Sequence, residues 1–120
     1  MNERRFLCVF RRAPHTDAVL REHLDLALTI AAFEQSVELL FLDDGVYALV
    51  PDQHSFPGDP SSPAELLAAL PLYGLEQPPL VEEESLHERG LDKDALLPAR
   101  RIDRRAVAAL FDGADVVLSL

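Results

Sequence analysis

Two adjacent carboxylates follow an apolar run near the middle of the sequence, and their type and spacing can support metal chemistry. The run Leu39–Leu42 leads directly into Asp43, Asp44 and Gly45. Carboxylates at the end of a parallel strand bind Mg²⁺ in receiver domains and in some phosphohydrolases. One hypothesis is therefore a stand-alone α/β metal-binding enzyme or a receiver-type switch that uses Asp43 and Asp44.

The receiver pattern fails in detail. The acidic pair follows the second predicted strand instead of the first, the third strand ends in glutamates, and no lysine follows the last predicted strand in this sequence. A turn is the favoured interpretation of the acidic pair. In that turn Asp44 caps a short helix over Val46–Val50, and Gly45 supplies a permissive backbone.

The single cysteine, Cys8, is the next candidate for chemistry. Reactive thiols need exposure and a positive or helix-terminal setting. Cys8 lies within the apolar run Phe6–Phe10, so we expect a buried structural thiol. One cysteine excludes an internal disulfide and is typical of a protein from a reducing cytosol.

The histidines and arginines offer weaker candidates. The four histidines lack metal-ligand spacing, and only His15 falls in a predicted strand-end loop, which makes it a candidate docking residue. Arg100, Arg101, Arg104 and Arg105 form a basic cluster that could contact an acidic partner, and the solvated start of a helix is the favoured interpretation. The sequence also lacks a glycine-rich phosphate loop, and we predict no metal and no cofactor.

Short apolar runs that do not alternate indicate strands covered on both faces. They predict strands at Phe6–Phe10, Val37–Leu42, Pro79–Glu82, within Leu96–Ile102 at an edge, and at Val116–Leu118. Helical patterns fall at 17–33, 46–50, 63–74, 85–90 and 104–111, and Pro51–Pro63 reads as a surface loop. The alternation predicts one domain over residues 1–120, a three-layer α/β/α fold with a mostly parallel five-stranded sheet.

Several local details follow from the helical patterns. We expect Leu66, Leu67, Leu70 and Tyr73 to face the sheet, Ser85 to open a capping box with Glu88, and Asp103 to cap the last helix. The late turns of the first helix, Ala27–Phe33, are apolar nearly all round. That surface is expected to lie under a loop or against another subunit.

The charge balance restricts the class of partner. The chain carries 21 acidic and 11 basic residues, a net charge of −10. Because nucleic-acid affinity rests on Lys and Arg neutralising phosphates, direct binding of tRNA or DNA by this chain is not expected. The apolar runs stay well short of the roughly eighteen residues of a membrane span, and a cytoplasmic location is expected.

Four motifs occur in order along most of the chain. They are Ala13-Pro14-His15, Phe41-Leu42-Asp43-Asp44-Gly45-Val46, Leu72-Tyr73-Gly74-Leu75-Glu76-Gln77 and Ser85-Leu86-x-Glu88-Arg89-Gly90-Leu91. Together they resemble the TusC/DsrF branch of the DsrE/DsrF sulfur-relay family. The resemblance implies a parallel five-stranded sheet between helices, as the apolar pattern also predicts.

The resemblance also implies partners and a pathway. The chain would join TusB-like and TusD-like subunits in a heterohexamer with two copies of each. That complex would contact TusA-like and TusE-like carriers and pass persulfide sulfur between them. In the Tus branch the sulfur ends in 2-thiolation of the wobble uridine of certain tRNAs, and in the Dsr branch it serves sulfur oxidation.

One departure from the family pattern concerns catalysis. In the sister subunit the persulfide cysteine ends the third strand, and counting back eight residues from Gly90 places Glu82 at about that position. A glutamate cannot carry a persulfide. The resemblance therefore implies a non-catalytic structural and docking subunit, with His15, Asp43, Asp44 and Gly45 as motif residues. Two hypotheses stay open, this subunit and the metal-binding enzyme or switch.

Overall fold

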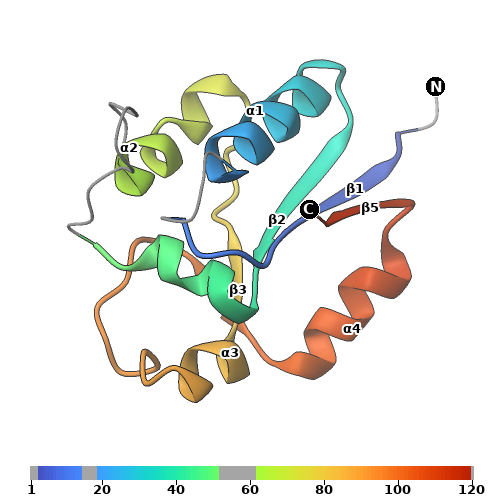
Figure 1. Cartoon of the computed structure of the whole chain (residues 1–120). Coiled ribbons are helices and arrows are strands. Elements are labelled where there is room, and N and C mark those ends of the chain that lie inside the picture. The colour runs from blue at the N-terminus through green and yellow to red at the C-terminus, as the bar shows by residue number, and fades with distance from the viewer. Residues whose placement is uncertain (1–2, 15–18, 52–61, 120) are drawn as a thin grey trace.

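The computed structural model describes residues 3–14, 19–51 and 62–119. Strands and helices alternate along these residues, as the apolar pattern predicts (Figure 1). The strands are β1 (Arg5–Phe10), β2 (Ser36–Phe41), β3 (Leu80–Glu82), β4 (Arg100–Ile102) and β5 (Val116–Ser119). The helices are α1 (Val19–Ala32), α2 (Pro63–Ala68), α3 (Glu83–Glu88) and α4 (Arg104–Gly113), and the 3₁₀ turns are η1 (Asp43–Leu49) and η2 (Leu70–Tyr73).

The strands form one sheet in the order β4-β3-β2-β1-β5, and every pairing is parallel. The predicted fold, a three-layer α/β/α domain with a five-stranded sheet, is thereby confirmed. β1 and β2 pair along their full length, from Arg5 with Ser36 to Phe10 with Phe41. β2 and β3 share only two pairs, Leu40 with Leu80 and Phe41 with Val81.

Helices cover both faces of the sheet (Figure 1). The chain steps from β1 to β4 in one direction, so right-handed crossovers place α1 and α2 on one face. The crossover from β4 back to β5 runs the other way and places α4 on the opposite face. Each layer has its own apolar core, with Phe10, Phe41 and Leu24 in the first and Val9, Leu40 and Val107 in the second.

Side chains cap the amino termini of two helices, α2 and α4. The Ser62 side chain accepts from the Glu65 N–H, and the Glu65 carboxylate accepts from the Ser62 N–H, which completes a capping box before Pro63. The Asp103 carboxylate accepts from the Ala106 N–H at 2.8 Å and caps α4.

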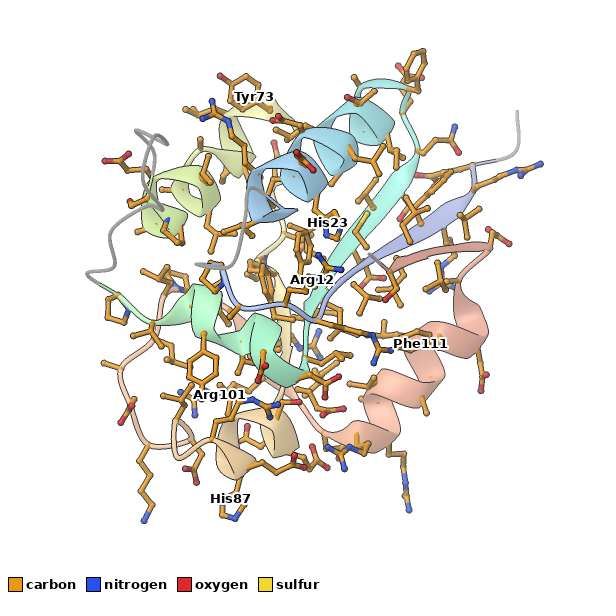
Figure 2. The ribbon with its side chains drawn as sticks, viewed as in Figure 1. Arg12, His23, Tyr73, His87, Arg101 and Phe111 are labelled. Carbon is orange, nitrogen blue, oxygen red and sulfur yellow. The ribbon has the colours of Figure 1, made fainter. Side chains whose placement is uncertain are left out.

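Two local expectations are wrong. Tyr73 is 64% exposed and points away from the sheet (Figure 2), because η2 follows Pro71 with 3₁₀ geometry and turns only Leu70 inward. β5 was expected to be buried, but it is an edge strand whose residues alternate between intermediate and exposed. β4 occupies the other edge, as predicted.

Within the described residues, no helix is long and apolar enough to cross a membrane. His15, its neighbour Thr16 and most of the predicted surface loop at Pro51–Pro63 lie outside the described residues.

Candidate functional site at the carboxyl edge of the sheet

Polar side chains gather where the parallel strands end. Arg11 follows β1, Asp43 follows β2, Glu82 ends β3, and Ser119 lies in β5. The Arg11 side chain bridges two of these ends, since its Nε donates to Ser119 Oγ at 3.2 Å and its Nη1 donates to Asp43 Oδ2 at 3.2 Å. This edge is where open α/β sheets place their functional groups.

Glu82 is the most buried charge at this edge. The residue is only 5% exposed, and its Oε1 accepts hydrogen bonds from Ser85 Oγ at 2.6 Å and from an Arg104 Nη2 at 2.9 Å. Burial favours the neutral acid, but the hydrogen bonds from Arg104 and Ser85 outweigh it and lower the pKa of Glu82 below its ordinary value. Glu82 is therefore a fixed, ionised carboxylate.

Ser85 joins the ends of β2 and β3. Its hydroxyl donates to Glu82 and accepts from the Asp43 N–H at 2.9 Å, and the residue is fully buried. The predicted capping role is wrong, because α3 begins at Glu83 and contains Ser85. The spacing to Glu88 suggested a local cap, whereas the actual partners lie at the two strand ends.

Asp43 and Asp44 each pair with an arginine. Asp43 meets Arg11 at 3.2 Å, and Asp44 Oδ1 accepts from Arg89 Nε at 3.0 Å. The predicted cap by Asp44 is wrong, since Leu42 is the N-cap of η1 and no side chain caps that turn. Asp43 itself adopts the left-handed backbone, with φ of 51°.

Gly45 is required for space. A Cβ at this position would lie 1.9 Å from the carbonyl oxygen of Phe10, so only glycine lets η1 pass this close to β1. Its φ is not in the positive range. The sequence indicated a permissive backbone, but the actual reason is a close approach between two backbone segments.

Arg104 was missed as a site residue, because it was interpreted as part of a solvated helix start. Its Nη2 contacts Glu82 at 2.9 Å and Glu88 at 3.0 Å, and its backbone N–H donates to Glu84 Oε2 at 3.0 Å. The glutamates raise the pKa of Arg104 above its ordinary value, so its charge is permanent. The partners lie 16 and more residues away, and no local pattern could have indicated them.

Arg101, from the same basic cluster, lies beside α3 (Figure 2). Its guanidinium donates to the carbonyl oxygens of Asp92 and Asp94 and lies 4.0 Å from Glu83. Arg101 therefore holds the α3–β4 loop.

Cys8 is buried in the middle of β1, where it pairs with Leu39 on one side and Leu118 on the other. Its side chain packs in the core beneath α1, and the residue is 3% exposed. Burial raises the pKa of Cys8 to about 11. The expectation of a buried structural thiol is confirmed, and the single sulfhydryl of the chain lies away from the carboxyl-edge charges.

The two described histidines serve local contacts. His23 packs edge-on against the Phe10 ring, with centroids 5.2 Å apart, and lies close to Arg12 (Figure 2). His87 is exposed, and its hydrogen bond to Asp92 at 3.1 Å raises the pKa of the imidazole. Among the described side chains, no three of the His, Cys, Asp and Glu type gather as a metal site would require.

The fold and this edge of charged residues define an all-parallel α/β domain with helices on both faces of its sheet. The structure superposes on that of the YchN protein of Escherichia coli with a TM-score of 0.81, covering 98% of this chain and 99% of that one at 22% identity. The DsrE/DsrF-like family matches residues 4–120, and the chain belongs to it.

The relatives that share more sequence carry one name. The chain is 36% identical to the protein TusC homolog of Pseudomonas aeruginosa over 95% of its own length and 96% of that protein. It is 33% identical to the protein TusC homolog of Vibrio parahaemolyticus over 92% and 94% of the two chains. These likenesses confirm the resemblance to the TusC/DsrF branch that the four sequence motifs indicated.

Proposed function

We propose that this chain is a non-catalytic structural and docking subunit of a TusBCD-type sulfur-relay complex. The observation that carries the proposal is Glu82, an ionised carboxylate held by Arg104 and Ser85 at the strand end where a sister subunit would carry its persulfide cysteine. The similarity to TusC homologs over almost the whole chain supports the same role.

The chemistry of sulfur transfer supports a passive role. A persulfide forms on a thiolate, and the thiolate must be accessible to the donor. Cys8 is the single cysteine of the chain, it is buried, and its pKa of about 11 keeps it protonated near neutrality. The Glu82 carboxylate cannot form a persulfide, so cysteines of the partner subunits would carry the sulfur.

The proposed partners follow from the family. TusB-like and TusD-like subunits would assemble with this chain in a cytoplasmic heterohexamer with two copies of each, and TusA-like and TusE-like carriers would bring and take the sulfur. The proposed end point is 2-thiolation of the wobble uridine in tRNA. The net charge of −10 favours contact with proteins over contact with the tRNA itself.

Mass spectrometry of the sulfur-loaded complex tests the passive role. The assembled complex would be incubated with a persulfide donor, and the intact mass of each subunit would be measured. We expect the gain of about 32 Da per sulfur on the TusD-like subunit and none on this chain. A persulfide on Cys8 would overturn the proposal.

Co-expression with the neighbouring reading frames tests the assembly. We expect two chains of similar size to co-purify with this one. The competing hypothesis, a stand-alone metal-binding protein that uses Asp43 and Asp44, instead predicts a monomer whose unfolding midpoint rises with Mg²⁺. The arginine partners of both aspartates count against a metal there.

A further inference from the structure

The amino-terminal half of β2 has an unpaired edge inside the sheet. β2 begins at Ser36, but its ladder with β3 begins only at Leu40. Residues 36–39 therefore pair with β1 on one side, and no strand among the described residues pairs with them on the other. In Figure 1, β2 extends well past the start of β3.

Backbone groups of two residues point toward this open side. The Ser36 N–H donates to the carbonyl oxygen of Arg4, and the Leu42 N–H donates to that of Phe10. Even-numbered residues of β2 therefore direct their backbone N–H and carbonyl groups toward β1. Successive residues of a parallel strand alternate in this respect. The N–H groups of Val37 and Leu39 and the carbonyl of Val37 therefore face away from β1, toward the open side.

Two prolines explain why the ladder between β2 and β3 does not extend toward the start of β2. Pro78 and Pro79 precede β3 and have no N–H groups to donate to β2. The Pro79 carbonyl is directed to the other neighbour, since it accepts from the Arg100 N–H at 2.8 Å. The chain therefore reaches β3 without extending the ladder along β2.

A groove of about 400 Å³ lies along this edge, and we name it the β2 groove. Val37, Glu38 and Leu39 line it on one side, and Glu76 and Pro78 line it on the other. It continues into a more apolar groove of about 430 Å³, because the two share Leu75, Glu76, Gln77 and Pro78. Leu67, Pro71 and Pro98 supply apolar surface in the second groove.

We propose that the β2 groove binds an extended segment of a partner protein, which adds to β2 as a short parallel or antiparallel strand. Its backbone would pair with Val37 and Leu39, and one apolar side chain would enter the neighbouring apolar groove. Two of the three charged residues that line the groove, Glu38 and Glu76, are acidic, and the third is Arg100. The excess of carboxylates favours a segment with lysine or arginine at its ends. This inference does not rest on the sulfur relay.

Amide hydrogen exchange of the full 120-residue chain tests the proposal. The probe is the blocked hexapeptide Lys-Leu-Thr-Leu-Thr-Lys, whose leucines share one face of an extended strand. In the free protein, the amides of Val37 and Leu39 should exchange faster than those of Glu38 and Leu40. Saturating peptide should slow the exchange of Val37 and Leu39 by about tenfold or more and leave Glu38 and Leu40 unchanged.

Two controls distinguish backbone pairing from nonspecific binding of the peptide. The same peptide methylated on its central backbone nitrogens keeps its charges and side chains and should not bind. Glu76→Lys should weaken binding of the unmodified peptide about two- to fivefold. Glu22→Lys makes the same charge change on α1, nine residues from Ala31 at the groove, and should leave binding unchanged.

Several outcomes would overturn the proposal. They are equal binding of the methylated peptide, slowing of exchange without the odd-numbered pattern, and no slowing at saturating peptide. Slowing of Val37 and Leu39 at high protein concentration without peptide would also overturn it, because the occupant would then be a second copy of this chain.

Discussion

At the end of β3, the Glu82 carboxylate exchanges its hydration shell for hydrogen bonds from Ser85 and Arg104. We predict that Glu82→Gln lowers the free energy of unfolding by about 1 kcal/mol, since hydrogen bonds to a charged group are stronger than neutral ones. Urea denaturation measures this change. Glu83→Gln removes the same charge from the half-exposed neighbour and should cost less than about 0.5 kcal/mol.

The protonation of Glu82 makes this contribution depend on pH. Its folded pKa lies below the ordinary value of 4.5, so the stabilisation is complete above pH 4.5 and is lost as the pH falls through the lowered pKa. We expect the stability difference between wild type and Glu82→Gln to be constant from neutrality to about pH 5 and to shrink at lower pH. A difference that grew in acid would contradict a lowered pKa.

Cys8 should resist alkylation in the folded protein. With a pKa of about 11, only about 0.1% of the thiol is ionised at pH 8, against about 10% for an ordinary value of 9.0. We predict that iodoacetamide reacts at least about a hundredfold more slowly with native protein than with urea-unfolded protein. Equal rates would mean that the thiol is accessible, and would weaken the proposed passive role.

At the scale of elements, η1 depends on one backbone contact. Gly45→Ala would press a Cβ against the Phe10 carbonyl, and we predict a loss of about 3 kcal/mol or more in unfolding free energy. Gly90→Ala is the matched control, because φ there is +70° but no atom lies within 4 Å of the added Cβ. That control should cost about 1 kcal/mol. Equal losses would refute the steric explanation.

The order of strands and helices along the chain could be anticipated from the sequence, while the carboxyl-edge network could not. Runs such as Phe6–Phe10 indicate buried strands through their apolar composition, which is a property of the local sequence. The interactions of Arg104 depend on α3 and β3 meeting the start of α4, and that meeting exists only after the sheet has formed. Ser85 was misread for the same reason, because a local cap and a distant partner use the same hydroxyl.

At the scale of the whole molecule, one large apolar side chain is exposed just past the end of α1. Phe33 is 72% exposed and belongs to the apolar late turns that were expected to lie under a loop or against another subunit. We predict that Phe33→Asp abolishes co-purification of the partner subunits and changes the unfolding free energy by less than about 0.5 kcal/mol. Ala108→Asp adds the same charge to an exposed position on α4 and should leave co-purification intact. Retention of the partners by the Phe33 variant would exclude this surface from the interface.

The position of β5 at the edge beside β1 affects how the chain folds during its synthesis. β5 pairs with β1, and the Asp115 carboxylate accepts from the Arg5 N–H, a contact that joins residues 110 apart in sequence. During translation the second edge of β1 therefore stays unpaired until residues 116–119 have left the ribosome. Such distant pairing slows folding and exposes an edge to unwanted association. Nascent chains of this protein should consequently depend on chaperones until residues 116–119 emerge.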